Sequence, residues 1–247
     1  MSNRNYIEDP REAQDYLSRL YKKSKRSVFF GGAGVSTASG IPDFRSVDGL
    51  YNQQFDYPPE TMLSHSFYLT HKEEFYDFYR TKMIALDAKP NACHVKLAQL
   101  EEDNKLQAVV TQNIDGLHQL AGSKQVFELH GSVHRNICGR CGAVYSAEWI
   151  MEHEGVPVCP VCAGEIKPDV VLYEEPLDER IMMGAIEAIA HTDTLVIGGT
   201  SLVVYPAAGL TQYFQGDNLV ICNMDPTSQD GMADALITCD IAQAYTF

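Results

Sequence analysis

Hydrophobic residues fall into two alternating patterns along the chain: short continuous runs, and longer runs spaced at helical intervals. Ala13, Leu17 and Leu20 lie three or four positions apart, which predicts an amphipathic helix over residues 10–25. The next residues, Ser27–Phe30 (SVFF), form a short apolar run typical of a buried strand. A glycine-rich loop follows at once, so the chain begins with a helix that feeds a strand and a loop.

The same alternation continues toward the carboxyl terminus. Aromatic and methionine side chains at near-helical spacing predict a helix over about His65–Met83, and Asn91 is placed to cap a helix over residues 92–103. Apolar runs predict strands at LQAVVT (Leu106–Thr111), TLVIGGTSL (Thr194–Leu202) and NLVICN (Asn218–Asn223), with a further helix between the last two.

Strands that alternate with helices in this way build a parallel sheet with helices on both faces, so we expect an α/β fold of the Rossmann-like type. Ligands of such sheets bind beyond the carboxyl ends of the strands. The predicted strands end in small or polar residues, and we expect these ends to line one crevice.

The composition is that of an ordinary soluble protein, with 45% hydrophobic and 21% charged residues in 247. A formal net charge of −14 argues against a nucleic-acid partner and suits a cationic peptide. The amino-terminal residues are polar, and no apolar run approaches the roughly 18 residues of a membrane helix. We therefore expect a cytoplasmic protein with no nucleic-acid or membrane partner.

Two Cys-x-x-Cys pairs lie in a stretch without a long predicted helix. Cys138 and Cys141 form the first pair, and Cys159 and Cys162 form the second, at a separation typical of a four-cysteine zinc site. Two disulfides or a redox pair are the alternatives, but disulfides are rare in the reducing cytosol. Four thiolates leave no open position on zinc, so we expect a structural ion.

This stretch, residues 132–166, is expected to form a small inserted unit, here called the four-cysteine module. Part of the helical region near residues 50–90 is expected to pack beside it. The flanking residues, 1–131 and 167–247, then form the domain that contains the parallel sheet.

The glycine-rich loop only partly matches the dinucleotide fingerprint of dehydrogenases. Gly32 and Gly34 fit the G-x-G-x-x-G pattern, but Thr37 occupies the third glycine position. The acidic ribose anchor expected about 20 residues later is also missing. Bare N–H groups from Gly31 to Gly34 could still cradle phosphates, and an ordinary tight turn is the alternative.

Seven motifs then occur in a fixed order along the chain. They are GAGVSTASGIPDFRS, TQNIDGLH (Thr111–His118), ELHG (Glu128–Gly131), the two cysteine pairs, KPDVVLYEE (Lys167–Glu175), GTSL (Gly199–Leu202) and the late Asn223. This set resembles the sirtuin family of NAD-dependent protein deacylases, and the resemblance runs from about Ser27 to the carboxyl terminus. It implies that NAD binds the sheet domain and is consumed rather than reduced, and that the module holds one structural zinc ion.

The resemblance implies that His130 of the HG motif is the catalytic base and that Asn113 orients a hydroxyl group or water beside it. Histidine suits proton transfer near neutral pH because its ordinary pKa is about 6.5. His118 and His134 are rivals on this ground alone, and the motif match favours His130. We expect His118 to close the QNIDGLH turn.

The resemblance also implies a set of NAD contacts from five parts of the chain. They are Ala33, Thr37, Phe44, Arg45, Gln112, Ile114, Asp115, Thr200, Ser201, Asn223 and Asp240. Asn and Asp also favour turns, so a capped turn is the alternative for the QNID residues.

By resemblance, Val171 and Tyr173 flank the stem of the acyl-lysine, and the substrate peptide pairs with their segment as an extra strand. The family usually has a glycine where this chain has Glu174. The Glu174 carboxylate either favours Lys or Arg in the peptide or points to solvent, and we expect solvent. Arg80 is one residue out of the Tyr-x-x-Arg spacing with which some sirtuins bind acidic acyl groups, which predicts weak desuccinylase activity.

We therefore expect an NAD-dependent protein-lysine deacylase, most simply a deacetylase, whose partners are acyl-lysine proteins or peptides. Mono-ADP-ribosyl transfer is an alternative that shares the NAD site and differs in the acceptor. A non-catalytic NAD-binding interaction module is a second alternative, which the presence of Asn113, Asp115 and His130 disfavours.

Overall fold

Seven parallel strands form the main sheet of the computed structural model, which describes residues 5–43, 49 and 57–247. The strand order is β1-β10-β9-β8-β2-β3-β4. The strands are β1 (Asn5–Ile7), β2 (Ser27–Gly31), β3 (Leu106–Thr111), β4 (Val126–Glu128), β8 (Thr194–Gly198), β9 (Asn218–Cys222) and β10 (Ala235–Ile237). The four longest strands of this sheet, β2, β3, β8 and β9, are the four that the apolar runs predicted. The prediction of an α/β fold is confirmed.

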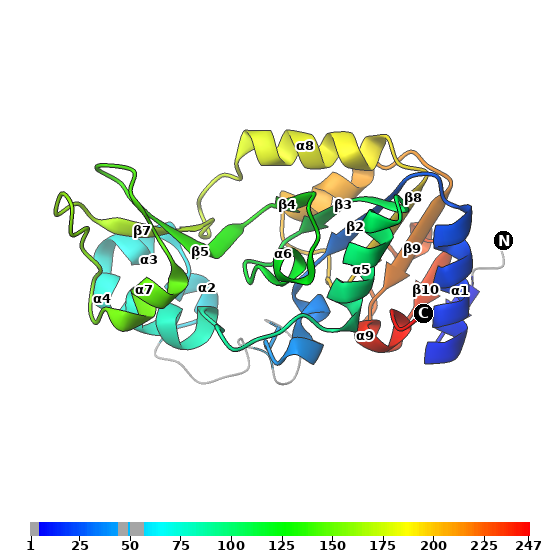
Figure 1. The fold of residues 1–247 in the computed structure, drawn as a ribbon, viewed down its shortest axis with the longest axis horizontal. Coiled ribbons are helices and arrows are strands. Elements are labelled where there is room, and N and C mark those ends of the chain that lie inside the picture. The colour runs from blue at the N-terminus through cyan, green and yellow to red at the C-terminus, as the bar shows by residue number, and fades with distance from the viewer. Residues whose placement is uncertain (1–4, 44–48, 50–56) are drawn as a thin grey trace.

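Successive residues of a strand point to opposite faces of the sheet. The central strands are apolar on both faces, so helices cover both. Phe29 of β2 packs with α1 (Pro10–Lys23), α5 (Ala92–Glu102) and α9 (Ile241–Ala244). Its neighbours Val28 and Phe30 pack with α8 (Glu179–Ala190) and the 3-10 helix Ala207–Tyr213 on the other face. Helix α6 (Leu117–Ala121) follows the loop after β3. In Figure 1, α8 lies apart from α1 and α5, across the sheet.

A second, antiparallel sheet has the order β6-β5-β7. Its strands are β5 (Gly131–Cys138), β6 (Val144–Tyr145) and β7 (Ile166–Val170), and α7 (Ala147–Glu152) packs on β5. Cys138 ends β5, and the other three cysteines of the two pairs lie in the turns that connect these elements. A third hydrophobic core joins these elements to the helical region α2 (Pro59–Met62), α3 (His65–Thr70) and α4 (Lys72–Phe78). Both groups lie at the end of the molecule away from the two termini (Figure 1).

Two helix predictions were wrong in detail. The predicted helix over His65–Met83 breaks at His71, whose φ of −134° is not helical, and it ends in a π-helical turn at Tyr79–Met83. The break lets the His71 ring stack on Phe67 while the following helix turns Phe75 and Tyr79 into the third core. The helix predicted between β8 and β9 is the 3-10 helix Ala207–Tyr213, which contains Gly209, a poor α-helix former.

Helix α8 and the three-residue strands β1, β4 and β10 were not predicted. Within the described ranges, no helix is both long and apolar enough to cross a bilayer.

Candidate active site

One cavity of about 320 Å³ opens at the carboxyl ends of β2, β3, β8 and β9. The loops after these strands form one wall. The residues after β7, together with Leu63 and Met83 of the helical region, form another. The strand ends therefore converge on one crevice, as the sequence predicted.

Most of the predicted site residues line this cavity. They are Ala33, Gln112, Asn113, Ile114, Asp115, His130, Val171, Tyr173, Thr200, Ser201 and Asn223. Thr37 is not among the lining residues; it is exposed, and its hydroxyl donates to the Gly34 carbonyl (3.0 Å). Asp240 does not line the cavity either, because its carboxylate caps α9 by accepting from the Gln243 N–H (2.9 Å). Phe44 and Arg45 lie outside the described residues.

The glycine loop is built differently from the expected cradle of bare N–H groups. The N–H groups of Gly32 and Gly34 donate to the carbonyls of Gly198 (3.1 Å) and Gly199 (2.8 Å). A Cβ on Gly34 would lie 2.8 Å from the Gly199 Cα, so the two loops touch main chain to main chain. These glycines hold β2 against β8, and the prediction that both amides are bare was wrong.

Ser36 joins two of the predicted residues and was missed by the sequence analysis. Its hydroxyl donates to Asp115 Oδ2 (2.6 Å) and accepts from Asn113 Nδ2 (3.1 Å). The Leu117 N–H donates to Asp115 Oδ1 (2.9 Å), which closes the turn after β3. Ser36 is buried beside the cavity, and a small polar residue that ends the GAGV loop is the only signal of its role in the sequence.

His130 is fixed in one tautomer. Its Nδ1 lies 2.9 Å from the Gln112 carbonyl, which can only accept, so Nδ1 carries the proton and the neutral ring keeps its lone pair on Nε2. Burial lowers the pKa of His130 below its ordinary 6.5, and the hydrogen bond to Gln112 opposes this shift only in part. At neutral pH the ring is therefore uncharged and can accept a proton.

The two rival histidines are placed less favourably. His134 donates its Nε2 hydrogen to the Asp115 carbonyl (2.9 Å) and is exposed. His118 is buried in α6 next to His94, and neither of its ring nitrogens has a hydrogen-bond partner among the described residues. The turn that His118 was expected to close is closed by Asp115 instead.

Side chains that follow β3 and β8, the two strands that flank β2, are tied together at the cavity. Gln112 Nε2 donates to Thr200 Oγ1 (3.0 Å), which links the loops after β3 and β8. Asn223 Nδ2 donates to the Asp225 carbonyl (2.7 Å). The cavity wall thus offers hydroxyl, amide and carboxylate groups, which suit the hydroxyl and amide groups of a nucleotide.

The edge segment Val171–Tyr173 runs along the cavity directly after β7. The Val171 N–H donates to the His130 carbonyl (3.0 Å), so this segment is bonded to the main chain of the predicted base. Tyr173 is partly exposed beside it. Glu174 is also exposed, but its carboxylate accepts from Ser66 rather than pointing freely into solvent.

Arg80 points away from the cavity, as its spacing predicted. Its Nε donates to the Ile150 carbonyl at the end of α7 (3.0 Å), and a further N–H donates to the Gly155 carbonyl. The guanidinium therefore ties the π-helical turn to the four-cysteine module, and Arg80 does not line the cavity.

The four cysteines converge at one point in the module. The Sγ atoms of Cys138, Cys141, Cys159 and Cys162 all lie within 4.8 Å of one another, with Cys138 and Cys162 3.5 Å apart. A tetrahedral zinc ion with four sulfur ligands needs sulfur atoms about 3.8 Å apart. The cluster therefore fits one zinc ion with four protein ligands, and Cys93, Cys222 and Cys239 lie elsewhere as free cysteines.

The Sir2 family model matches residues 32–206 of this chain. An NAD-dependent protein deacetylase of Clostridium acetobutylicum is 56% identical over 92% of this chain and 94% of its own length. The corresponding protein of Clostridium perfringens is 57% identical over the same shares of the two chains.

Solved structures agree with these sequence matches. A Sir2 structure described with a deacetylated p53 peptide and 3'-O-acetyl ADP-ribose has a TM-score of 0.86 at 38% identity and covers 94% of this chain and 95% of its own. A Sir2 structure described with a p53 peptide and NAD⁺ has a TM-score of 0.82 at 40% identity, with the same coverage. The family match, the close relatives and the shared fold together show that this chain belongs to the Sir2 family.

Proposed function

We propose that this protein is an NAD-dependent protein-lysine deacetylase, which moves an acetyl group from lysine to ADP-ribose and releases nicotinamide. The observation that carries the proposal is His130, a neutral base held in one cavity with Asn113, Asp115 and the edge segment. The relatives that bear the name deacetylase, and the Sir2 structures described with acetylated peptide or NAD⁺, support it.

The donor set suits NAD as a substrate. Thr200, Ser201 and Asn223 line the cavity after β8 and β9, on one side of β2, and Asn113 and Asp115 line it after β3, on the other side. Asp115 accepts from Ser36 and Leu117, and its carboxylate has lone pairs left for an amide N–H such as that of nicotinamide. We assign Phe44, Arg45, Thr37 and Asp240 to NAD by resemblance alone.

NAD supplies an electrophilic ribose carbon, from which nicotinamide can leave. The acyl-lysine carbonyl oxygen takes this ribose carbon as its bond to nicotinamide breaks. His130 Nε2 then accepts a proton from a ribose hydroxyl, and the oxygen of this hydroxyl attacks the acyl carbon. Water adds, the bond between the acyl carbon and the lysine nitrogen breaks, and free lysine and O-acetyl-ADP-ribose leave. Asn113 donates to Ser36, so its Oδ1 is oriented to accept from a hydroxyl or water. Ile114, Val170 and Leu172 contribute apolar surface to the same cavity and exclude water from it.

We assign one zinc ion to Cys138, Cys141, Cys159 and Cys162. A site with four protein ligands leaves no open position for water, so the ion serves folding rather than chemistry. The strand β7 begins at the last residue of this module and leads directly into the edge segment, so zinc supports the cavity wall that this segment forms.

We assign acyl-lysine proteins or peptides as the second substrate, paired along the edge segment as an added strand. The net charge of −14 favours peptides with positive charge. We also propose a cytoplasmic location, because none of the seven cysteines forms a disulfide, as is usual in reducing compartments.

The test is to incubate the protein with NAD and an acetyl-lysine peptide and to analyse the products by mass. We expect deacetylated peptide, nicotinamide and O-acetyl-ADP-ribose in equal amounts. An ADP-ribose adduct on an acceptor, with the acetyl group still on lysine, would support mono-ADP-ribosyl transfer instead. NAD that stays intact would leave a non-catalytic module as the function.

A further inference from the structure

The edge segment Val171–Tyr173 is anchored to the start of helix α3. The Tyr173 N–H donates to the Leu63 carbonyl, and the His65 N–H donates to the Tyr173 carbonyl, both at 3.0 Å. These two bonds form an isolated parallel bridge between Ser64 and Tyr173. The segment already makes strand-like contacts on one side, so its other side is held in a fixed position relative to the cavity.

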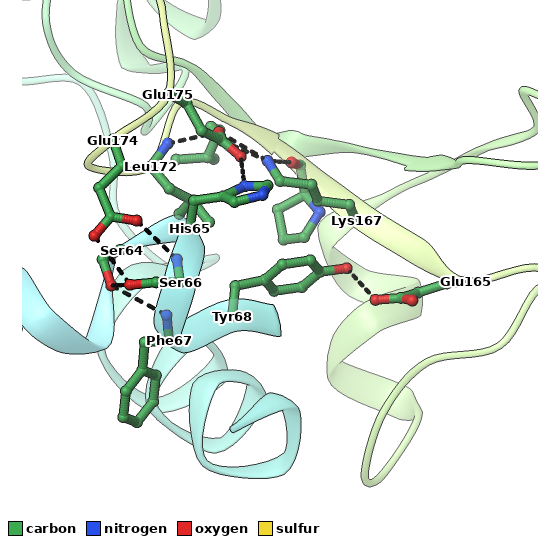
Figure 2. A network of polar contacts seen from close by, with 12 residues as sticks. Ser64, His65, Ser66, Phe67, Tyr68, Glu165, Lys167, Leu172, Glu174 and Glu175 are labelled. Carbon is green, nitrogen blue, oxygen red and sulfur yellow. Dashed lines mark hydrogen bonds and ion pairs between the residues drawn. The ribbon is translucent and has the colours of Figure 1, made fainter. Parts of the chain in front are cut away.

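Glu174 extends this anchor with its side chain. Its carboxylate accepts from the Ser66 N–H and from the Ser66 hydroxyl, both at 2.9 Å (Figure 2). The first N–H groups of a helix have no partner within the helix. In α3 they are satisfied in turn by the Tyr173 carbonyl, the Glu174 carboxylate and the Ser64 hydroxyl. The first turn of α3 and residues 173–174 are therefore one hydrogen-bonded unit.

The backbone of Glu174 is in the left-handed conformation, with φ of +75°. This conformation is unfavourable for any residue with a Cβ, and glycine adopts it freely. Glu174 stands where the Sir2 pattern usually has glycine, so the chain retains a strained residue at this turn. The two bonds to Ser66 offset that strain and fix the carboxylate.

Glu175 braces the same turn from the other side. Its carboxylate accepts from the Leu172 N–H (2.9 Å), from Lys167 Nζ (3.1 Å) and from His65 Nδ1 (2.7 Å). Burial of this carboxyl group raises its pKa, but these three donors outweigh burial and hold the pKa of Glu175 below its usual range. The charges of Glu175 and Lys167 are thus paired, whereas no Lys or Arg forms an ion pair with Glu174 within the described residues.

On the basis of the proposed function, we propose that Glu174 is a positioning residue, whose bonds to Ser66 hold the edge segment in the conformation that pairs with the acyl-lysine peptide. A strand that is ordered before binding loses less conformational entropy when the peptide pairs with it, and the peptide binds more tightly as a result. Glu174 acts on the peptide through the position of Val171 and Tyr173, and it has no part in proton transfer.

Three substitutions separate the hydrogen bonds of Glu174 from its charge. Glu174→Gly tolerates φ of +75° but loses both bonds and the charge. Glu174→Gln loses the charge and keeps an amide that can accept from the Ser66 N–H and donate to its hydroxyl. Ser66→Ala keeps the charge and loses one of the two bonds. Glu73→Gln on neighbouring α4 is the matched control, because it removes a similar exposed charge.

Steady-state kinetics with an acetyl-lysine peptide is the first measurement. We expect Glu174→Gly to raise the peptide KM by about fivefold or more, and Ser66→Ala by about two- to threefold, the size expected for lost hydrogen bonds. Glu174→Gln and Glu73→Gln are expected to stay within about twofold of the unmodified protein. The KM for NAD and kcat at saturating peptide are expected to change little in all four variants.

Hydrogen exchange of the peptide-free protein is the second measurement. We expect the amides of residues 64–67 and 171–174 to exchange faster in Glu174→Gly than in the unmodified protein, and at an unchanged rate in Glu73→Gln. Unchanged exchange in Glu174→Gly would overturn the proposal even if KM rises. A KM that rises equally in Glu174→Gln and Glu174→Gly, and not in Ser66→Ala, would also overturn it and assign the effect to charge.

The two levels of inference can fail separately. If the unmodified protein does not deacetylate the peptide, the proposed function fails while the exchange data still report on the anchor. If the unmodified protein is active and Glu174→Gly has the same peptide KM, the proposed function stands and the role of Glu174 is refuted.

Discussion

The two sheets of this protein supply different walls of one cavity and are stabilised in different ways. The seven-stranded sheet is buried between helices on both faces, and its central strands β2, β3 and β8 pack through apolar side chains without metal ligands. The three-stranded sheet is small, and the sheet and its connecting turns expose apolar residues such as Val144, Val158 and Val161 and hold a cluster of four thiols. The cavity wall at the strand ends of the main sheet, where we propose that NAD binds, therefore depends on hydrophobic burial. The wall formed by the edge segment Val171–Tyr173, where we propose that the peptide binds, depends on the proposed zinc ion.

This difference separates the two binding steps physically. The strand ends that face the proposed NAD site are held by long buried strands, whereas β7 and the edge segment are the continuation of the four-cysteine module. Destabilisation of the module is expected to weaken peptide binding before NAD binding. Destabilisation of the main sheet is expected to weaken both.

Removal of zinc with a strong chelator is expected to have the largest effect. A structural zinc site contributes on the order of 10 kcal/mol to folding, so the module should open while the main sheet stays folded. Hydrogen exchange should speed up over residues 131–170 and remain slow in β2, β3 and β8, and peptide binding should be lost before NAD binding. Cys239→Ser, which changes a cysteine outside the cluster, should leave hydrogen exchange, peptide binding and NAD binding unchanged. Equal loss of protection in both sheets would contradict the separation.

The substitution His130→Ala tests the cavity itself, where the two walls meet. Removal of a general base lowers kcat by about 10²- to 10⁴-fold, and we expect deacetylation to fall by this amount. NAD binding and thermal stability should change little, because the ring makes one hydrogen bond to Gln112. His191→Ala, at the exposed end of α8, is the control and should keep full activity. Activity within threefold of the unmodified protein would assign the base to another residue.

A pair of core substitutions compares the stability of the two sheets directly. Phe29 and Ile166 are both fully buried. Phe29 lies in the core between the main sheet and α1, α5 and α9, and Ile166 lies in the third core, which joins the four-cysteine module to the helical region. Phe29→Ala should cost about 3–5 kcal/mol and Ile166→Ala about 2–5 kcal/mol. The single tryptophan, Trp149, lies in α7 and reports on the module, whereas circular dichroism reports on all helices.

The two signals should respond differently in urea. Phe29→Ala should shift both transitions together to lower urea. Ile166→Ala should shift the Trp149 transition further than the circular dichroism transition. Coincident transitions in both variants would mean that the two sheets unfold as one cooperative unit.

A smaller effect is expected from pH. Burial lowers the pKa of His118 to about 3, with His94 adding to the shift. Burial also lowers the pKa of His94 to about 4, although Asp115 opposes this shift. Both histidines bind protons more weakly when folded, so the unfolded chain takes up more protons between about pH 6.5 and 4. The free energy of unfolding should therefore fall as pH falls through this window.

Urea titrations at pH 7 and pH 5 measure this loss. His118→Leu, which removes one of the two titrating rings, should show a smaller difference between the two pH values. His118 packs beside Phe29 and His94, so the effect should appear in the circular dichroism transition of the main sheet. An equal difference in His118→Leu and the unmodified protein would exclude His118 as a source.

The sequence was sufficient for the central strands and for the cysteine cluster, and the reasons are local. The strands that contain Val109 and Val196 are buried on both faces, so they appear in the sequence as unbroken apolar runs. The edge strands β1, β4 and β10 have three residues each and carry no detectable period. Helix α8 includes Gly184, which lies against the Phe127 ring, and its apolar run has no clear boundary from the sequence alone.

The candidate site was predicted residue by residue through motifs, and what was missed depends on distant contacts. Ser36 orients Asn113 and Asp115, which are more than 70 positions away along the chain. The bonds from Ser66 to Glu174 join residues 108 positions apart. Neither pairing has a local signature, and the break at His71 likewise depends on how Phe67 packs in the folded protein.

The contact between the two glycine loops limits which substitutions can change the shape of the cavity. Any side chain at Gly34 would meet the Gly199 main chain, and any side chain at Gly199 would meet Val35 while adopting φ of +58°. The spacing of β2 and β8 at the cavity is thus set by the length of main-chain hydrogen bonds and not by a residue that substitution can resize. Side chains that substitution can resize, such as Tyr173, Met83 and Leu63, line the wall that we propose for the peptide, so we expect new substrate preferences to arise there.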